Sequence, residues 1–273
     1  MQASSSWTAP GGTLGGLVAE ARERATALQP RRAELERQAA LGIVARRFAA
    51  SLTHAQVGII AEVKRRSPSK GWINPGLSAA DQARSYARGG AAAISVLTEP
   101  AHFGGSNDDL RDVLAAVSLP VLKKDFHVDP IQLVEARALG ATAALVIARA
   151  LSPEVLRTMM DAGRELGLEL LVEIRDEDEL ERSLDAGAAV IGINNRNLET
   201  LVIEAGTAER LLARIPASVV AIAESGVTGR ADVERVATCG ADAVLVGSSI
   251  SGAPDPVSAV RELATVPRVG RDR

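Results

Sequence analysis

The sequence has few of the residues that build crosslinked, metal-bound or membrane-spanning proteins. Cys239 is the only cysteine in 273 residues, so the chain can form no internal disulfide and offers no Cys/His metal framework. Its longest apolar runs are too short to cross a bilayer, and its first residues lack the basic start and apolar run of a signal peptide. We therefore expect a soluble cytoplasmic protein without a metal site.

The chain also lacks a large excess of positive or negative charge. Lys and Arg number 31 and Asp and Glu 34, a net charge of −3, which creates no field that attracts nucleic acid or an anionic membrane. Aromatic residues are only 2% of the chain, while 47% of it is hydrophobic, so the core must consist of Ala, Val, Leu and Ile. Such a core suits parallel strands covered by helices. We expect no nucleic-acid or membrane partner, and no obligate protein partner is evident.

Short apolar runs alternate with amphipathic helical segments along most of the chain. Several helical segments begin at Asp or Ser and end at a Gly-Ala pair just before the next run. Eight strand-helix units predict an α/β fold, a (β/α)8 TIM barrel. A doubly wound open sheet remains the alternative, although no G-x-G-x-x-G follows the first strand. The predicted strands are 57–63, 91–97, 120–125, 142–148, 168–174, 189–194, 219–225 and 242–247.

The part of the chain before the barrel has a different composition. Residues 1–12 are rich in Ser, Pro and Gly and are expected to form a disordered tail. Residues 13–50 carry helical periodicity, interrupted at Pro30, and predict an N-terminal helical extension packed on the barrel. Residues 51–273 are then the barrel and the catalytic domain.

Charged and amide side chains end strands that are otherwise apolar. The carboxyl ends of barrel strands meet at one mouth, where the active sites of such barrels lie. One such charge alone could mark only the point where a strand leaves the core, but the whole set favours an active site. These residues are Glu62, Lys64, Lys123, Lys124, Asp125, Glu173, Asn194, Glu224 and Ser225.

Two further features bear on this mouth. Glu62 and Lys64 lie two residues apart on a strand and point the same way, whereas the basic residues Arg65, Arg66 and Lys70 that follow are expected to be solvated. A localisation tag is disfavoured because the stretch continues directly from a buried strand. Glycines after the last two strands could offer backbone N–H groups to a phosphate. This favours a phosphorylated ligand.

Seven segments of the chain carry a shared pattern: EVKRRSPSKG (62–71), ISVLTEPAHFGGS (94–106), VLKKDFHVDP (121–130), LLVEI (170–174), IGINNRNLETL (191–201), AESGV (223–227) and VLVGSSI (244–250). In this order, over about residues 13–255, they resemble the indole-3-glycerol phosphate synthase family. The resemblance implies a barrel lyase of tryptophan biosynthesis, which works without a cofactor. Members of the family are carboxy-lyases that convert 1-(2-carboxyphenylamino)-1-deoxyribulose 5-phosphate to indole-3-glycerol phosphate, CO₂ and water.

The resemblance also implies roles for individual residues. Lys124 is similar to the family's general acid, which protonates the substrate ketone, and Glu173 to the acidic partner that stabilises positive charge. Glu62 and Lys64 resemble the pair that serves the carboxylate and the dehydration, and Asn194 positions hydroxyl groups. The division of proton transfers among the two Lys and two Glu stays open. Implied substrate contacts are Ser67, Phe103, Phe126, Arg196, Leu198, Glu224 and Ser225, and implied phosphate contacts are Gly226, Gly247 and Ser248.

An acid that protonates a ketone works best with a pKa near neutrality. We expect burial and the neighbouring cation Lys64 to lower the pKa of Lys124, whereas Lys123 faces the other way. His102 and His127 are not expected to be catalytic. Trp72 and the loop 251–256 depart from the family's pattern at the mouth. Two other functions stay open: a Schiff-base lysine enzyme, as in class I aldolases, and a catalytically silent phosphate-binding barrel.

Overall fold

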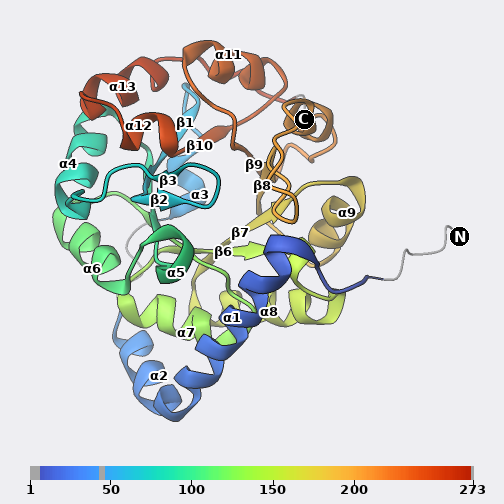
Figure 1. Cartoon of the computed structure of the whole chain (residues 1–273). Helices are drawn as coiled ribbons and strands as arrows, with labels where there is room; N and C mark the ends of the chain where they lie inside the picture. The colour runs from blue at the N-terminus through green and yellow to red at the C-terminus, as the bar shows by residue number, and fades with distance from the viewer. Residues whose placement is uncertain (1–6, 43–46, 272–273) are drawn as a thin grey trace, which may run out of the picture.

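The computed structural model describes residues 7–42 and 47–271 and contains a closed barrel of eight parallel strands (Figure 1). The first strand pairs with both the second and the last barrel strand, so the TIM barrel is confirmed and the open sheet is wrong. All eight predicted strands are present, each one or two residues shorter than predicted. They are β1 Gly58–Val63, β4 Ala93–Leu97, β5 Val121–Lys124, β6 Ala143–Ile147, β7 Glu169–Ile174, β8 Val190–Asn194, β9 Val220–Glu224 and β10 Ala243–Val246.

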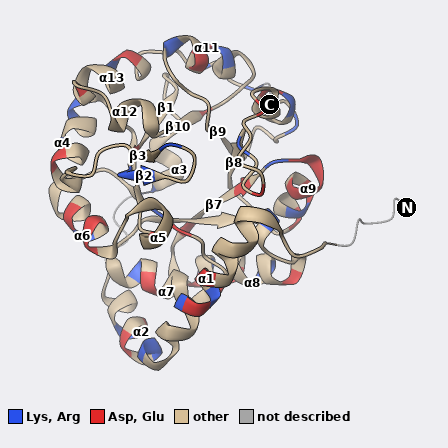
Figure 2. Ribbon diagram, in the orientation of Figure 1, with Lys and Arg blue, Asp and Glu red and all other residues tan. Residues whose placement is uncertain are grey.

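Helices surround the barrel and cover the outer faces of its strands (Figure 1). Acidic and basic residues are interspersed over these helices (Figure 2), in line with the small net charge. In the described part of the chain, no helix is both long and apolar enough to cross a membrane. The helices are α4 Ala79–Gly89, α6 Asn107–Ala116, α7 Pro130–Leu139, α8 Pro153–Leu166, α9 Glu177–Asp185, α10 Gly206–Leu212, α11 Arg230–Thr238 and α13 Pro256–Leu263.

Local sequence explains where many of these helices begin and end. A Ser or Asp side chain accepts a backbone N–H of the first turn at α4, α7, α8 and α9. The predicted glycine stops adopt the left-handed conformation that a residue with a side chain rarely takes. Their φ angles are 95° at Gly90, 98° at Gly140, 82° at Gly187 and 95° at Gly240.

Helices α1 Gly12–Leu28 and α2 Arg32–Leu41 precede the barrel and pack on it, joined by the turn η1 Gln29–Arg31 at Pro30; the short α3 Phe48–Ser51 follows. Leu14 and Leu17 of α1 are buried in the main core, while Leu35 of α2 is buried in a smaller cluster with α7. The predicted tail falls partly on residues 1–6, outside the described residues. Within its described part, the Trp7 indole donates to the Arg149 carbonyl at 3.3 Å.

Short elements follow the carboxyl ends of the strands and build the mouth of the barrel. In Figure 1 these elements are drawn over the open end: the hairpin of β2 Arg66–Ser67 and β3 Gly71–Trp72, and the helices α5 Pro100–Phe103 and α12 Ser248–Ser251. The hairpin lies between β1 and α4, α5 follows β4, and α12 follows β10. The short turn η2 Ala148–Ala150 follows β6.

Candidate active site

A cavity opens at the carboxyl ends of the barrel strands and encloses about 1270 Å³, its open mouth included. Helix α1 contributes Thr13 and Leu17 to its wall, so the N-terminal helix belongs to the site. All fifteen residues predicted for the site line this cavity. They are Glu62, Lys64, Ser67, Phe103, Lys124, Phe126, Glu173, Asn194, Arg196, Leu198, Glu224, Ser225, Gly226, Gly247 and Ser248.

Lys124 lies at the centre of the site, within reach of three carboxylates. Its Nζ is 3.4 Å from Glu224 Oε2, 3.7 Å from Glu173 Oε2 and 3.9 Å from Glu62 Oε2. The four side chains come from β5, β9, β7 and β1, so only closure of the barrel brings them together. All three carboxylates are buried. Lys124 therefore lies near three carboxyl groups at once, of which Glu62 is also paired with Lys64.

The predicted pKa of Lys124 is wrong in direction. Burial alone would lower the pKa, but the charges of Glu224, Glu173 and Glu62 outweigh burial and raise it above its ordinary value. The predicted cationic neighbour does not act as expected either, because Glu62 lies between the two ammonium groups: its Oε1 is 2.5 Å from Lys64 Nζ. Lys124 therefore stays protonated at neutral pH, and its pKa falls only when the charge of the surrounding carboxylates changes.

Two of the three carboxylates have pKa values shifted in opposite directions. Burial would raise the pKa of Glu62, yet the charges of Lys64 and Lys124 lower it. Burial raises the pKa of Glu224 to about 8; Lys124 opposes this shift, and Glu173 and Glu62 add to it. Neither carboxylate oxygen of Glu224 has a hydrogen-bond partner among the described residues. At neutral pH the site therefore holds one ionised and one protonated carboxyl beside Lys124.

Asn194 fixes the position of Glu173. Its Nδ2 donates to Glu173 Oε1 at 2.9 Å, and its Oδ1 accepts the backbone N–H of Arg196 at 2.9 Å. The second oxygen of Glu173 stays directed toward Lys124. The amide thus orients a carboxylate and links it to the loop after β8.

The two predicted phenylalanines meet at the cavity wall. The ring centroids of Phe103 and Phe126 are 6.2 Å apart and the planes are tilted by 40°. Such a pair offers apolar contact area to a flat ring. Leu198 lines the same cavity from the loop after β8.

The loops after β9 and β10 bend sharply at the predicted phosphate site. Ser225 has a φ of 62° and Gly226 a φ of 85°. A serine in the left-handed region is an uncommon conformation, and such backbone strain concentrates at functional sites. Gly247 and Ser248 lie at the start of α12. Both segments therefore present backbone to the cavity.

The position of Gly247 also has a consequence for chemistry. A Cβ on this residue would overlap Glu62 Oε1 and lie 2.8 Å from Lys64 Nζ. We expect Gly247→Ala to lower kcat about tenfold and to raise KM as well, because the methyl group displaces this ion pair and lies at the predicted phosphate contact. Steady-state kinetics measure both parameters. Gly252→Ala is the control, since its Cβ would make an ordinary 3.5 Å contact with Ile73; a rise in KM alone at position 247 would contradict the expectation.

Some predictions for the flanking basic residues are corrected. Arg65, predicted to be solvated, is partly buried and bound to Asp109 by both Nη1 at 2.5 Å and Nη2 at 2.7 Å. The guanidinium carbon Cζ of Arg66 lies 5.7 Å from the ring centroid of the exposed Trp72. Lys70 is exposed, as predicted, and also lines the cavity. The fixed Arg65 anchors the start of the hairpin to α6.

Lys123 faces away from the cavity, as predicted from its parity. It is buried outside the barrel, where its Nζ lies 3.3 Å from Asp125 Oδ2 and 3.5 Å from Glu135 Oε2. Asp125, predicted at the mouth, lines the cavity but uses its carboxylate in this outer network. Lys123 therefore belongs to the support of β5.

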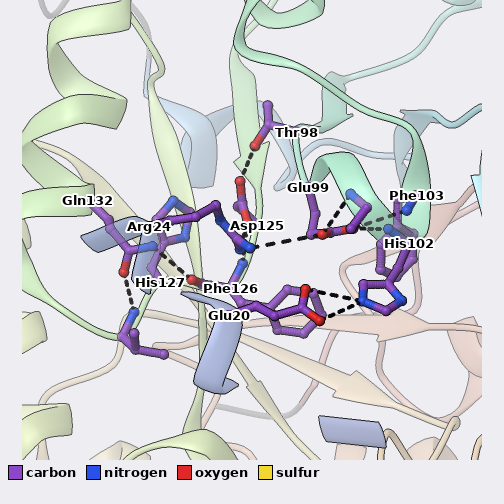
Figure 3. A network of polar contacts seen from close by, with 12 residues as sticks. Glu20, Arg24, Thr98, Glu99, His102, Phe103, Asp125, Phe126, His127 and Gln132 are labelled. Carbon is purple, nitrogen blue, oxygen red and sulfur yellow. Dashed lines mark hydrogen bonds and ion pairs between the residues drawn. The ribbon is translucent and has the colours of Figure 1, made fainter. Parts of the chain in front are cut away.

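Polar contacts from α1 reach the segments that carry the two phenylalanines (Figure 3). Arg24 Nη2 lies 3.0 Å from Asp125 Oδ1, and Glu20 Oε1 lies 3.1 Å from His102 Nε2. Glu99 accepts backbone N–H groups of α5, including that of Phe103 at 3.0 Å. The Glu99 cap is local, but nothing in the local sequence indicates the contacts of Arg24 and Glu20, because their partners are 101 and 82 residues away in the chain.

The two histidines take part in structural contacts. His127 Nδ1 lies 2.7 Å from the Leu145 carbonyl, and burial lowers its pKa to about 4, so the ring is neutral. Among the described residues, one group of side chains has the spacing of metal ligands: the carboxylate or imidazole atoms of Glu20, Glu99 and His102 lie within 4.8 Å of one another. The Glu99 carboxylate, however, already caps α5 with three backbone N–H bonds. This cluster is explained by the packing of α1 on α5.

Comparison with known proteins places the chain in a family. The sequence profile described as "Indole-3-glycerol phosphate synthase" matches residues 15–263. The chain belongs to the indole-3-glycerol phosphate synthase family. A relative named indole-3-glycerol phosphate synthase 1, from Streptomyces coelicolor, is 50% identical over 230 residues, 84% of this chain and 86% of its own. A second from the same organism, indole-3-glycerol phosphate synthase 2, is 46% identical over 257 residues, 92% of this chain and 98% of its own.

A likeness to a solved structure extends to the fold alone. The thiamine phosphate pyrophosphorylase of Pyrococcus furiosus superposes with a TM-score of 0.56 at 18% identity, covering 76% of this chain and 93% of that one. At this identity the likeness describes the barrel and carries no function. Membership of the indole-3-glycerol phosphate synthase family rests on the sequence matches.

Proposed function

We propose that this chain closes the indole ring of 1-(2-carboxyphenylamino)-1-deoxyribulose 5-phosphate, giving indole-3-glycerol phosphate, CO₂ and water in tryptophan biosynthesis. One observation carries the proposal: Lys124 faces three buried carboxylates inside a cavity that also holds an aromatic pair. In a chain of this family, that arrangement supplies a proton donor and negative charge at one point.

The cavity suits the two ends of this substrate. We assign the phosphate to the backbone of Gly226, Gly247 and Ser248, with Ser225 and Ser67 nearby. The aromatic ring then lies against Phe103 and Phe126, with Leu198 completing the apolar wall. Arg196 and Lys64 are the cations for the ring carboxylate. This orientation brings the ketone to the middle of the cavity, at Lys124.

The first chemical step is ring closure. The ring carbon that bears the carboxylate attacks the ketone carbon, and Lys124 gives its proton to the ketone oxygen. The positive charge that develops on the nitrogen and ring is stabilised by Glu173. Loss of CO₂ returns the electron pair of the broken bond to the ring. A raised pKa ensures that Lys124 carries its proton at neutral pH before the reaction starts.

Dehydration completes the indole. The new hydroxyl group leaves as water after accepting a proton, and a ring proton passes to a base, which restores aromaticity. Lys64 and Glu62 form an ion pair of 2.5 Å at the cavity wall, so one acid and one base are adjacent. We assign this step to that pair, with Asn194 orienting the hydroxyl groups.

A cytoplasmic location of the protein remains a prediction.

A direct assay tests the proposal. The purified protein is incubated with the carboxyphenylamino-deoxyribulose phosphate, and indole fluorescence and released CO₂ are measured together. We expect both products in equal amounts. Binding of the substrate without either product would contradict the proposal and favour a silent phosphate-binding barrel.

A second experiment separates proton donation from covalent catalysis. A Schiff-base enzyme needs a neutral lysine amine, whereas the carboxylates around Lys124 raise its pKa and keep it protonated. We expect sodium borohydride added during turnover to leave the protein mass unchanged while indole forms. A class I aldolase treated in parallel is the control for trapping. A substrate-sized mass increase on Lys124 would instead identify an imine.

A further inference from the structure

Strand β8 carries a glycine, Gly192, on the inner face of the barrel. It pairs in register with Glu173 of β7 and Ile222 of β9, and it lies two residues before Asn194 on the same face. Its φ is not among the positive glycine angles of the described chain, so the backbone itself does not require glycine. If glycine is required at position 192, the reason must be steric: a side chain there would have no room.

The space beside Gly192 is filled by Glu224. A Cβ on Gly192 would overlap Glu224 Oε1 and lie 3.1 Å from both Glu224 Cδ and Leu171 Cδ1. In the ladder Glu224 pairs with Asn194, so its side chain reaches back along the barrel axis to the level of Gly192. The carboxylate therefore occupies the volume that any other residue at position 192 would fill.

Little else holds this carboxylate. Neither Glu224 oxygen has a hydrogen-bond partner among the described residues, and its polar contact is with Lys124 Nζ at 3.4 Å. The other charged groups that face it are Glu173 from β7 and Glu62 from β1, and both repel it. Its place thus depends on the hollow at Gly192 and on the single ammonium group.

We propose that Gly192 is a positioning residue: the hollow left by its missing side chain seats Glu224 against Lys124 and so sets how readily Lys124 gives up its proton. The inference rests on the proposed function, in which Lys124 is the acid. It predicts that filling the hollow changes the chemistry more than the fold, because the displaced atoms are the far end of a flexible side chain.

The pH dependence follows from the geometry. Burial raises the pKa of Glu224 to about 8, so below that pH the carboxyl is neutral and Lys124 faces two charged carboxylates. Above it Lys124 faces three, holds its proton more tightly and is a weaker acid. We therefore expect kcat to fall as the pH rises through about 8, and Gly192→Ala to move this fall.

The kinetic test compares Gly192→Ala with a matched control. Because a Glu224 carboxylate displaced from Lys124 holds the Lys124 proton less tightly, we expect Gly192→Ala to weaken and shift the fall of kcat near pH 8, and to change KM less than about threefold. The control, Gly163→Ala on α8, places a methyl group 2.8 Å from Leu170 Cγ and Cδ1, so it crowds the core without touching a carboxylate. It should keep the wild-type pH profile. A wild-type profile in Gly192→Ala would overturn the proposal.

A rescue variant keeps the test decisive if Gly192→Ala packs poorly. Glu224→Asp shortens the side chain by one methylene and frees room for the alanine methyl. We expect Glu224→Asp, when added to Gly192→Ala, to return the pH at which kcat falls toward its wild-type value. Additive shifts of that pH would mean that residues 192 and 224 act independently, which contradicts the inference.

A readout independent of activity separates this inference from the proposed function. Infrared difference titration of the intact protein should show a protonated carboxyl band that titrates near pH 8 and is absent in Glu224→Gln. We expect its midpoint to move in Gly192→Ala and to stay unchanged in Gly163→Ala. If the wild type makes no indole, the proposed function fails. The titration still reports whether the Glu224 carboxyl occupies the hollow at Gly192. An unmoved midpoint in Gly192→Ala would overturn the inference itself.

Discussion

Replacing Lys124 by methionine should lower kcat by about three orders of magnitude, within the range that general acid catalysis contributes. Methionine keeps most of the side-chain length and apolar volume but cannot protonate the ketone oxygen. The aromatic pair and the phosphate loops are untouched by Lys124→Met, so KM should change only a few-fold. Single-turnover kinetics with indole fluorescence would measure the loss in the chemical step.

The neighbouring lysine provides a matched control for this prediction. Lys123→Met removes the same charge from the same strand, but on the outer face, where the Nζ contacts Asp125 and Glu135. It should lower the melting temperature, because it leaves Glu135 without its lysine and the buried Asp125 with Arg24 as its remaining cation. Its kcat should stay within about fivefold of wild type. Equal losses of kcat in the two variants would remove Lys124 from the role of acid.

Much of this architecture could be predicted because it depends on local sequence. Each buried strand is an apolar run, and each Gly-Ala stop requires a left-handed φ that glycine adopts readily. The parity of residues on a strand placed Lys124 and Lys123 on opposite faces. Because a barrel gathers its strand ends, the polar residues at those ends could be predicted to share one cavity.

The electrostatics could not be predicted in the same way. The pKa of Lys124 depends on how many carboxylates lie within a few ångströms of its Nζ. That number is set by how far each glutamate side chain extends along the barrel axis, which the order of the strands does not determine. Glu224 reaches back to Gly192, a contact that no spacing in the sequence indicates. Arg24 and Asp125 are 101 residues apart, and Arg65 and Asp109 are 44 apart. Such pairs become visible only when the chain is folded.

The second large effect is expected for Glu173→Gln, which should lower kcat by about two orders of magnitude or more. Glutamine has nearly the same shape, and its oxygen can still accept the Asn194 amide that lies 2.9 Å from Glu173 Oε1, so the fold should be retained. The charge that stabilises the developing cation is lost.

The pH profile of this variant should also move, and its direction follows from the charges. Glu173 raises the pKa of both Lys124 and Glu224, so its removal lowers both values, and the fall of kcat at high pH should shift to lower pH. Glu169→Gln is the control, since Glu169 begins the same strand at the other end of the barrel and contacts the backbone of Phe48 and Ala49. It should keep both kcat and the pH profile. A Glu173→Gln enzyme with near-normal kcat and an unshifted profile would show that the reaction does not use this carboxylate, and the stabilising charge would have to come from Glu62 or Glu224.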